Sequence, residues 1–428
     1  MPFAAYMREH MLEPLGMDET TILQPVPEPL AGQISLGYSD AGHGEFEEED
    51  FEYVPLAPVG AVSSSADDMA RLMIAYLQDG RLGDARILTE ETARRMRQPL
   101  FRHADGLNAA LYGFMDMSQM GQTIYGHGGD TFWFHTLFAL LPEHDVGVFL
   151  SYNTDTGAAG RERFLEAFLE RYFPVDEPPA LEIARGAVER AERYAGNYRV
   201  VRYTQTDFTK IAAALGPLEV SADSGALTID DDPTRYLELS PGLYREEEGH
   251  GRIAFRDDEA AEPAYLFIDP FQIIAFERVD GVGSPAVQAA VVLFSAGVFL
   301  LALIFWPYVS LLRWRYGATP PEERRLPRWA RVLSWTACLG FLAFAAMLGA
   351  GAGDPNAIAM GDLEGIRRVL TVGLVAALLG AITAALGLWF WLTGRGSVWT
   401  RVVYSAVGVA CLLAIWQMSY WNLLGFRL

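Results

Sequence analysis

Four long apolar runs in the last third of the chain constrain its fold more than any other feature. The runs lie near residues 286–312, 329–351, 366–393 and 398–421. Each is longer than the roughly 20 residues that a helix needs to cross a bilayer. Only helices can span there, because lipid offers the backbone no hydrogen-bond partners. Tryptophans gather near the run ends, from Trp306 to Trp421, as in an interfacial aromatic belt. The sequence therefore predicts a membrane domain at 285–425 with four transmembrane helices.

Arginines beside these runs predict the orientation of the helices. Six lie in the loop between the first two runs: Arg313, Arg315, Arg324, Arg325, Arg328 and Arg331. Arg395 and Arg401 flank the last loop. Arginine-rich loops face the cytoplasm, so the middle loop is expected outside. That loop holds Asp354, Asp362 and Glu364, next to Arg367 and Arg368. We therefore expect an integral protein of the cell (inner) membrane, with residues 1–284 on the extracytoplasmic side.

Residues within the runs favour an anchor over a transporter. No charged residue lies in the middle of a run, so no carrier for a proton or ion path is visible. The third run has small residues at helical spacing, namely Gly373, Ala377, Gly380, Ala384 and Gly387. This stripe predicts close approach of a neighbouring helix. Cys338 and Cys411 lie in apolar runs, which favours buried thiols over a disulfide or a metal site.

Acidic residues dominate the chain before the runs. Residues 285–428 hold 5 acidic and 11 basic residues, so residues 1–284 carry a net charge of −27 and the whole chain −21. Such a surface repels phosphates, so nucleic acid is not an expected partner. The histidines and cysteines form no cluster with metal-ligand spacing, and neither a metal nor a cofactor is expected.

The middle region, 190–280, is predicted to be a small all-β module. Short β-prone runs are separated by turn-forming residues. They are Leu218–Ser221, Ala226–Ile229, Tyr236–Leu239, Arg252–Phe255, Ala264–Ile268 and Ile273–Arg278. This spacing is typical of an antiparallel meander or barrel. A packing and spacer role is favoured over a ligand pocket.

Residues 1–175 are predicted to combine helices with a β-hairpin. Ser65 is an expected helix N-cap with Asp68 at the third helical position, and Gly80 ends the helix. Residues 134–141 and 146–152 form the expected hairpin across a four-residue turn. Residues 161–173 form an amphipathic helix with one aromatic face, which is expected to cover the hairpin. The residues of that face are Phe164, Phe168 and Tyr172.

Three segments in this region stand in a fixed order: 11–20, with the sequence Met-Leu-Glu-Pro-Leu-Gly-Met-Asp-Glu-Thr, then 58–68, and then 125–129 followed by 134–153. Together they resemble β-lactamase-related serine hydrolases, which share their fold with class C β-lactamases and penicillin-binding proteins. Residues 194–198 resemble the opening of the small barrels that often follow such domains. The resemblance implies an α+β remnant of a β-lactamase/transpeptidase-like domain, before the all-β module and the four-helix transmembrane region.

The resemblance also implies an active site of which only one motif can be found in this sequence. In the family, the serine of Ser-x-x-Lys is the nucleophile, and its lysine and a Tyr-x-Asn tyrosine move the proton. Here the single lysine, Lys210, follows Asp207 at that spacing, so no such pair exists. Both motifs precede the 11–20 element in the family, which leaves no room for them here. The segment Tyr38–Asp40 is interpreted as a loop and not as the tyrosine motif.

The motif that can be found is the third one, Tyr125–Gly129. By resemblance His127 takes the place of the motif's basic residue, and His127 with Gly129 are the candidate catalytic positions. Tyr125, Gly128 and Asp130 are the candidate substrate-binding residues, and the two glycines allow close approach of a substrate backbone. The alternative is a structural histidine on a sheet edge. His135 and His144 are expected at the surface or in turns.

These features predict the C-terminal portion of a membrane-anchored β-lactamase-related serine hydrolase. The intact family cleaves amide or ester bonds through an acyl-serine, and its partners are a small-molecule or peptide substrate. This chain is predicted to be inactive without a nucleophile and its base. No signal peptide is recognisable at Pro2–Met11, so a missing N-terminal part is expected, as a true remnant or through a start at an internal Met.

An alternative is a non-catalytic envelope module, in which the outer domain binds peptidoglycan or a peptide and four helices anchor it or signal. The residues do not separate an esterase, a peptidase and a β-lactamase. They also leave the oligomeric state open.

Overall fold

The computed structural model describes residues 1–175, 185–214, 216–260, 262–317, 327–350 and 363–428. Arg324, Arg325, Asp354 and Asp362, which entered the prediction of orientation, lie outside the described residues. The chain divides into two compact units, which are described separately. Unit 1 is Met1–Ala195 with Val220–Glu277, and unit 2 is Gly196–Glu219 with Arg278–Leu428. The expected boundaries of three regions stay a prediction.

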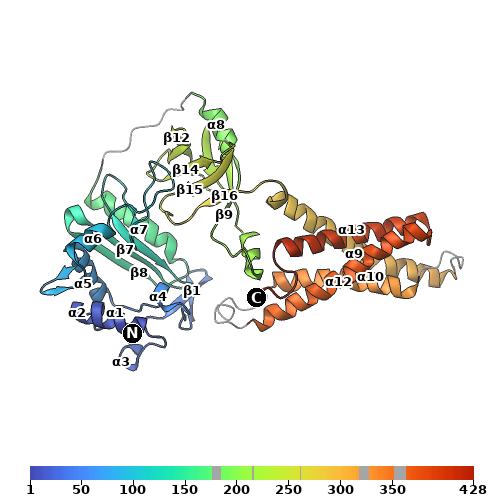
Figure 1. The fold of residues 1–428 in the computed structure, drawn as a ribbon, viewed down its shortest axis with the longest axis horizontal. Coiled ribbons are helices and arrows are strands. Elements are labelled where there is room, and N and C mark those ends of the chain that lie inside the picture. Colours follow the sequence, from blue (N-terminus) through green and yellow to red (C-terminus); the bar gives the residue numbers. More distant parts are fainter. Residues whose placement is uncertain (176–184, 215, 261, 318–326, 351–362) are drawn as a thin grey trace. The chain divides into compact units, whose positions relative to one another are not determined.

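The centre of unit 1 is a four-stranded antiparallel sheet with a helix on each face (Figure 1). Its strand order is β5 (Met115–Asp116), β6 (Tyr125–Asp130), β7 (His135–Leu141) and β8 (Val146–Tyr152). On one face, α5 (Ala66–Leu77) contributes Met73 to a core with Phe138 and Leu140. On the other, α7 (Gly157–Tyr172) packs against β7. The predicted hairpin is confirmed.

Helix α7 buries leucines where an aromatic face was expected. Leu165 and Leu169 are four residues apart and therefore share one side of the helix. Both are buried against the sheet. Phe164 and Tyr172 are exposed and stack along the flank of the helix through Phe168. The prediction that Phe164 and Tyr172 cover the hairpin is wrong, because the leucine side of the helix faces the sheet.

The shorter elements of unit 1 surround this sheet. They are α1 (Phe3–Met7), η1 (Arg8–Leu12), α2 (Glu13–Leu15), α3 (Glu28–Ala31), β1 (Gly37–Gly42), β2 (Glu45–Glu49), α4 (Ala57–Gly60), β3 (Arg81–Leu82), β4 (Ala85–Arg86), η2 (Pro142–His144) and α6 (Glu90–Met96). Tyr38–Asp40, expected as a loop, belongs to the hairpin of β1 and β2. The backbone of Tyr38 also bonds to Asn153 and Asp155 beyond β8. These long-range bonds give the segment an extended conformation.

The N-terminal segment is attached to the start of α5 through a buried carboxylate. Asp68 is 3% exposed and accepts hydrogen bonds from the backbone N–H of Glu19 and the hydroxyl of Thr20, each at 2.8 Å. The Ser65 hydroxyl accepts from the Asp68 N–H, so the predicted N-cap is confirmed. Thr21 and Ser63 exchange backbone hydrogen bonds. Two of the segments that carry the resemblance therefore lie in direct contact.

Eight strands form a closed barrel. Their order is β10 (Leu218–Asp223), β11 (Ala226–Ile229), β12 (Tyr236–Ser240), β13 (Leu243–Glu246), β14 (Arg252–Asp257), β15 (Pro263–Ile268), β16 (Phe276–Arg278) and β9 (Gly196–Val200). Helix α8 (Ala187–Tyr194) is held to it by two hydrogen bonds from Arg190 to buried Glu238. Strand β13 was not predicted, because its four residues lie between two turns and show no clear apolar alternation.

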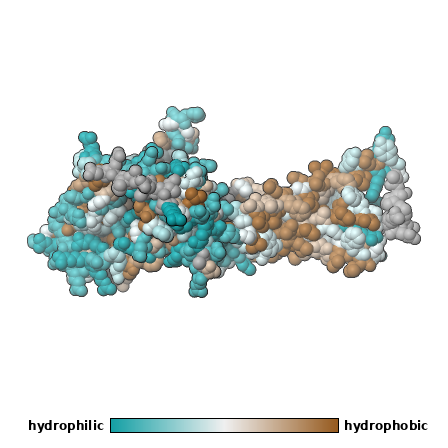
Figure 2. Space-filling view, turned by 90° about the horizontal axis from the view of Figure 1, so that it is seen from above, coloured by the Kyte–Doolittle hydropathy of each residue, from teal (hydrophilic) through white to brown (hydrophobic). Residues whose placement is uncertain are grey.

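Unit 2 contains four helices that are long and apolar enough to cross a membrane. They are α9 (Pro285–Arg315), α10 (Arg328–Gly349), α12 (Glu364–Thr393) and α13 (Val398–Tyr420). The 3-10 helix η4 (Gly281–Gly283) precedes α9. Figure 2 shows the apolar surface over these helices. The four predicted helices are confirmed, with ends within a few residues of those expected.

The small residues of α12 allow close helix packing, as predicted. A Cβ on Gly380 would lie 2.8 Å from the Phe341 ring, and one on Gly387 would lie 3.1 Å from the carbonyl oxygen of Tyr404. Neighbouring helices therefore approach where the side chain is absent. Cys338 and Cys411 are fully buried in this bundle.

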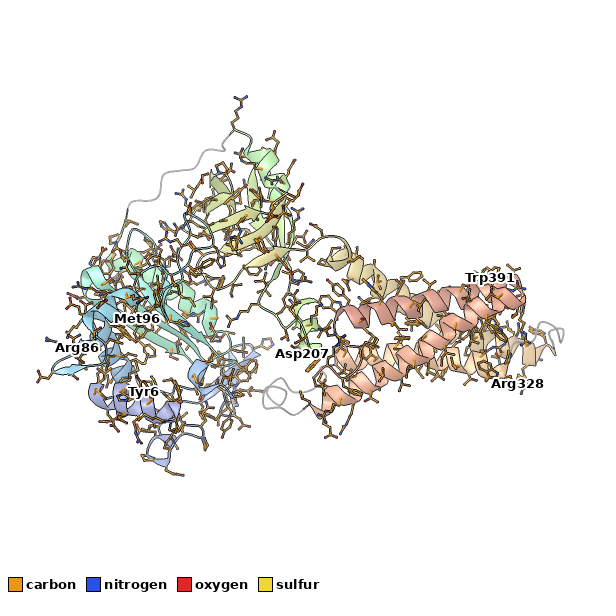
Figure 3. All side chains as sticks on the ribbon, viewed as in Figure 1. Tyr6, Arg86, Met96, Asp207, Arg328 and Trp391 are labelled. Carbon is orange, nitrogen blue, oxygen red and sulfur yellow. The ribbon has the colours of Figure 1, made fainter. Side chains whose placement is uncertain are left out.

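Residues 201–214, which include η3 (Phe208–Ala214), pack on one end of the bundle within unit 2. The Asn422 side-chain amide donates to the carbonyl oxygens of Gln205 and Asp207. Figure 3 labels Asp207 at this end, and Arg328 and Trp391 at the opposite end. The chain before the helices is thus bound to the bundle by buried polar contacts.

Candidate functional site

Strand β6 carries the third-motif residues in a regular antiparallel register with β7. Gly126 pairs with Ala139, His127 with Phe138 and Gly129 with Thr136. A side chain at Gly126 would collide with the Phe138 carbonyl oxygen, and a Cβ at Gly129 would lie 2.5 Å from the Thr136 hydroxyl. Glycine at these two positions therefore keeps the strand close to its neighbour.

The outer edge of β6 is only partly covered. Strand β5 pairs with Tyr125 and Gly126, and its pairing does not extend to residues 127–130. Within the described chain, no named strand pairs with this last part of the edge. Free backbone N–H and C=O groups on a sheet edge can bind an extended chain. Of the candidate residues, His127, Gly128, Gly129 and Asp130 therefore lie on the part of the edge that no described strand pairs with.

His127 lies on the exposed part of this edge. Its Nδ1 is hydrogen-bonded to the carbonyl oxygen of Gly128. A carbonyl only accepts, so Nδ1 carries the proton, and in the neutral ring Nε2 is left as an acceptor. In the protonated ring both nitrogens donate, and Nε2–H would then point a donor at a ligand anion. The exposed position fits the predicted role, which nevertheless stays a prediction.

Tyr125 lies in the core below the edge. It is 3% exposed, and its ring packs edge-on against Phe114 at 5.2 Å. The guanidinium of Arg97 lies 5.7 Å from the ring centroid. Burial raises the pKa of the Tyr125 hydroxyl, and Arg97 opposes this rise. This tyrosine supports the start of β6, and its contact with a substrate stays a prediction.

Asp130 ends the strand in an ionic cluster that was not predicted. Its Oδ1 accepts from His135 Nδ1 at 2.6 Å and from Arg161 at 2.7 Å. Burial raises the pKa of Asp130, but the hydrogen bonds from Arg161 and His135 outweigh it and bring the pKa below its ordinary value. The carboxylate thus joins α7 to the tip of the β6–β7 hairpin.

His135 was expected at the surface or in a turn, and this prediction is wrong. It begins β7, is 7% exposed, and its Nε2 has no hydrogen-bond partner in the part of the chain that the structure describes. Asp130 and His135 are paired across the hairpin, which brings the His135 Nδ1 to the Asp130 carboxylate. No local pattern predicts the contact with Arg161, which is 31 residues from Asp130. His144 lies in a turn, as expected.

The barrel supports β5 from within unit 1. The Gln272 side chain donates to the Asp116 carbonyl oxygen at 2.5 Å, and Asp269 accepts from the Asn108 N–H at 3.1 Å. Leu107 packs with Phe267 and Ala254 of the barrel. Asp116 pairs with Tyr125, so these contacts fix the strand that covers the first residues of β6.

The electrostatics of this contact follow from burial. Burial raises the pKa of Asp269, although Arg252 lies 3.1 Å away and opposes the change. Burial also lowers the pKa of His103, and the positive charge of Arg256 lowers it further. His103 stacks on Phe267 at 4.4 Å.

The lysine that acyl chemistry of this kind would require has another position. Lys210 belongs to unit 2, where its Nζ lies 4.9 Å from the centroid of the Tyr420 ring. Among the described residues, no three His, Cys, Asp or Glu side chains gather as metal ligands. The exposed part of the β6 edge carries backbone groups and the imidazole of His127.

The comparisons with known proteins identify the first part of the chain. The family model described as Beta-lactamase matches residues 1–170. None of the curated proteins matches the chain. Residues 1–170 thus form a Beta-lactamase-family domain with a Beta-lactamase-like fold.

Solved structures also match at low identity. One is the octameric penicillin-binding protein homologue from Pyrococcus abyssi, at 16% identity over 64% of this chain and 60% of that chain, with a TM-score of 0.35. SurE matches at 19% identity over 65% of this chain and 64% of its own, with a TM-score of 0.43. The D-stereospecific amidohydrolase from Streptomyces sp. matches at 19% identity over 41% of this chain and 50% of its own, with a TM-score of 0.32. The match to this chain spans less than two thirds of the length of each of these proteins.

Proposed function

We propose that this chain, whose first 170 residues belong to the Beta-lactamase family, provides the substrate-binding edge and the membrane anchor of a β-lactamase-related serine hydrolase. The proposal rests on one observation above all. His127 and Gly129 lie on a partly open strand edge, while the sequence contains no Ser-x-x-Lys pair to act beside it. The chain alone is proposed to bind substrate without acyl transfer.

The missing step follows from the chemistry of serine. A neutral hydroxyl is a weak nucleophile and needs an adjacent base. The nearest hydroxyl on the pairing strand, Thr136, donates to the Gly129 carbonyl oxygen at 3.3 Å. The only lysine is Lys210, and Asp130 is held by Arg161 and His135. Asp130 is therefore engaged by two donors and is not a free base beside the Thr136 hydroxyl.

The proposed ligand is a short acylated peptide, or an amide or ester with a similar backbone. An extended chain can add to β6 through main-chain hydrogen bonds beside residues 127–130. No described strand pairs with residues 127–130 on this side, and protonated His127 can pair with a carboxylate. The intact family hydrolyses such bonds through an acyl-serine. The residues of this edge do not separate esterase, peptidase and β-lactamase substrates.

A second candidate is a non-catalytic envelope module that binds peptidoglycan or a peptide and uses four helices as anchor or signal. The same observation favours it, because binding needs no nucleophile. The DNA sequence upstream of the first codon separates the two candidates. An in-frame Ser-x-x-Lys and Tyr-x-Asn would support the hydrolase, whereas a stop codon next to a ribosome site would support the module.

The proposed orientation places residues 1–284 outside the cytoplasm in the cell (inner) membrane. Arg313, Arg315, Arg328, Arg395 and Arg401 all flank the same two helix connections. The connections follow α9 and α12, so they lie at one end of an up-and-down bundle. Such an excess of arginine favours the cytoplasmic side.

The binding proposal is tested by hydrogen exchange on the purified full chain in detergent, with an N-acyl-D-alanyl-D-alanine peptide at millimolar concentration. We expect protection of amides in residues 125–131, and loss of that protection in His127→Ala. His144→Ala is the matched control, because His144 is exposed in the turn at the other end of β7. Absence of protection, or equal protection in both variants, would overturn the proposal.

A further inference from the structure

A small cleft between α9 and α10 forms where both helices approach the arginine-rich end of the bundle. Its volume is about 190 Å³. The residues that line it are Trp306, Pro307, Ser310, Arg331, Val332 and Trp335. Drug-sized ligands occupy roughly 300–1,000 Å³, so this cleft suits one small polar group and not a whole metabolite. It lies entirely within unit 2.

A proline builds one wall of the cleft. Pro307 has no N–H, so the carbonyl oxygen of Leu303, four residues earlier, has no helical donor. The indole N–H of Trp335 donates to that oxygen at 3.4 Å. Trp335 is thereby fixed against α9. Trp306 is held from behind by Tyr404, with ring centroids 5.4 Å apart. Two indole rings therefore border the cleft in fixed positions.

Arg331 contributes a guanidinium to the otherwise largely apolar lining of the cleft. Arg331 donates to the Ser310 hydroxyl at 3.2 Å, and that hydroxyl donates to the Trp306 carbonyl oxygen at 2.8 Å. A guanidinium has five N–H donors in a planar fork. In the described part of the chain, Arg331 forms no ion pair within 4.0 Å. Its remaining donors are free for an anion of matching geometry, such as a phosphate.

The surroundings are cationic and contain no described acid. Residues 306–317, 327–335 and 388–404 have no aspartate or glutamate, and they carry six arginines. In the intervening 318–326 segment, two glutamates are balanced by two arginines. Arg401 is engaged by the carbonyl oxygens of Gly394 and Gly396, and Arg395 lies over Trp389. Arg331 is the arginine that lines the cleft itself.

The depth of the cleft places it at the edge of the hydrocarbon. Helix α10 has 22 residues, about 33 Å at 1.5 Å per residue, which only just spans the roughly 30 Å hydrocarbon core. Arg331 lies one turn from its start, at the level of lipid head groups. Val332 and Leu339, seven residues apart on α10, are 64% and 45% exposed. They continue as an apolar track from the cleft along the helix.

We propose that this cleft binds the head-group phosphate of an anionic glycerophospholipid. The Arg331 fork holds the phosphate, the two indoles border the glycerol region, and an acyl chain lies along Val332 and Leu339. Basic pockets between transmembrane helices are a recurrent setting for such lipids. The proposal rests on membrane insertion, not on substrate binding at β6, so the two can fail separately.

The test uses the purified full chain in a mild detergent, with native mass spectrometry to count bound lipid. The probes are dioleoyl-phosphatidylglycerol, dioleoyl-phosphatidylcholine and inorganic phosphate. We expect one tightly retained phosphatidylglycerol. Arg331→Gln should weaken it by about 10- to 100-fold, the range for a hydrogen bond to a charged group. Arg328→Gln, which removes the same charge one turn earlier at an exposed position outside the cleft, should weaken it less than threefold.

Folding of Arg331→Gln is checked by far-ultraviolet circular dichroism. If this variant does not fold, two further variants still test the proposal. Arg331→Lys keeps the charge and should retain part of the binding, and Ser310→Leu fills the cleft from α9 and should lose it. Equal loss in the Arg328 and Arg331 variants would overturn the proposal. So would equal retention of phosphatidylcholine, or displacement of the lipid by inorganic phosphate at equal concentration.

Discussion

Replacing Asp68 by alanine removes the acceptor that joins residues 11–20 to helix α5. The carboxylate accepts from the Glu19 N–H and the Thr20 hydroxyl, each at 2.8 Å, and is 3% exposed. A hydrogen bond to a charged group contributes about 1.5–3 kcal/mol. Thr20 can turn its hydroxyl to Ser64, 2.7 Å away, so part of one bond is recovered. We expect the segment to lose about 2–4 kcal/mol of local stability.

Hydrogen exchange of the full chain in detergent measures this loss directly. Thr21 and Ser63 exchange backbone hydrogen bonds, so peptides covering 16–22 and 61–64 report the opening. A loss of about 2–4 kcal/mol corresponds to exchange roughly 30- to 1,000-fold faster. Exchange of the amides in α9, α10, α12 and α13 should not change.

Asp67→Ala is the matched control for this experiment. Asp67 precedes Asp68 in the first turn of α5 and is exposed. Replacing it by alanine therefore removes the same negative charge from near the helix N-terminus, where such a charge is favourable. In Asp67→Ala we expect the exchange rates of the same peptides to change by less than about fivefold. Similar acceleration in both variants, or less than threefold in Asp68→Ala, would show that the carboxylate does not hold the two segments together.

The remaining predictions concern the bundle and the hairpin tip. Gly380→Ala should destabilise the bundle by about 1–3 kcal/mol, because its Cβ would lie 2.8 Å from Phe341 in a packed interface. Gly297→Ala is the control, because a Cβ there would have no atom within 4 Å, and it should be neutral or stabilising by up to about 1 kcal/mol. Thermal unfolding is followed by circular dichroism. A lower unfolding temperature for Gly297→Ala than for Gly380→Ala would contradict the close packing at Gly380. The lowered pKa of Asp130 means that its ionised form is favoured by folding. This stabilisation is present above the unfolded pKa of about 3.9 and is lost as pH falls through the lower folded value. Hydrogen exchange of residues 128–136, corrected for its intrinsic pH dependence, should therefore accelerate in acid in the wild type, and Asp130→Asn should already be fast at pH 6; a variant with wild-type exchange would refute the role of the cluster.

Much of the fold was predictable because local signals agreed with it. The four long apolar helices follow from length and hydropathy alone, and the Ser65 cap and the β7–β8 hairpin follow from short-range patterns. The structure differs where long-range contacts decide. Tyr38 becomes a strand residue through bonds to Asn153 and Asp155, and no local pattern encodes those partners.

The candidate site shows the same limit. The spacing of Tyr125–Gly129 indicated the strand, and the register with β7 is regular. The environment of its residues depends on distant segments. Asp130 meets Arg161 across the sheet, and Gln272 of the barrel reaches the carbonyl oxygen of Asp116. A single sequence gives no sign of either pairing, so the roles of Asp130 and His135 at the hairpin tip were not foreseen.

Covalent labelling is the most direct measurement of whether this chain supplies a binding edge without acyl chemistry. The purified chain is incubated with a fluorophosphonate probe and, separately, with a labelled penicillin, and its intact mass is measured before and after. We predict an unchanged mass under conditions in which an active serine hydrolase is fully labelled. A stoichiometric adduct that maps to one serine in residues 1–170 would show that an activated nucleophile is present, and would contradict the proposed function.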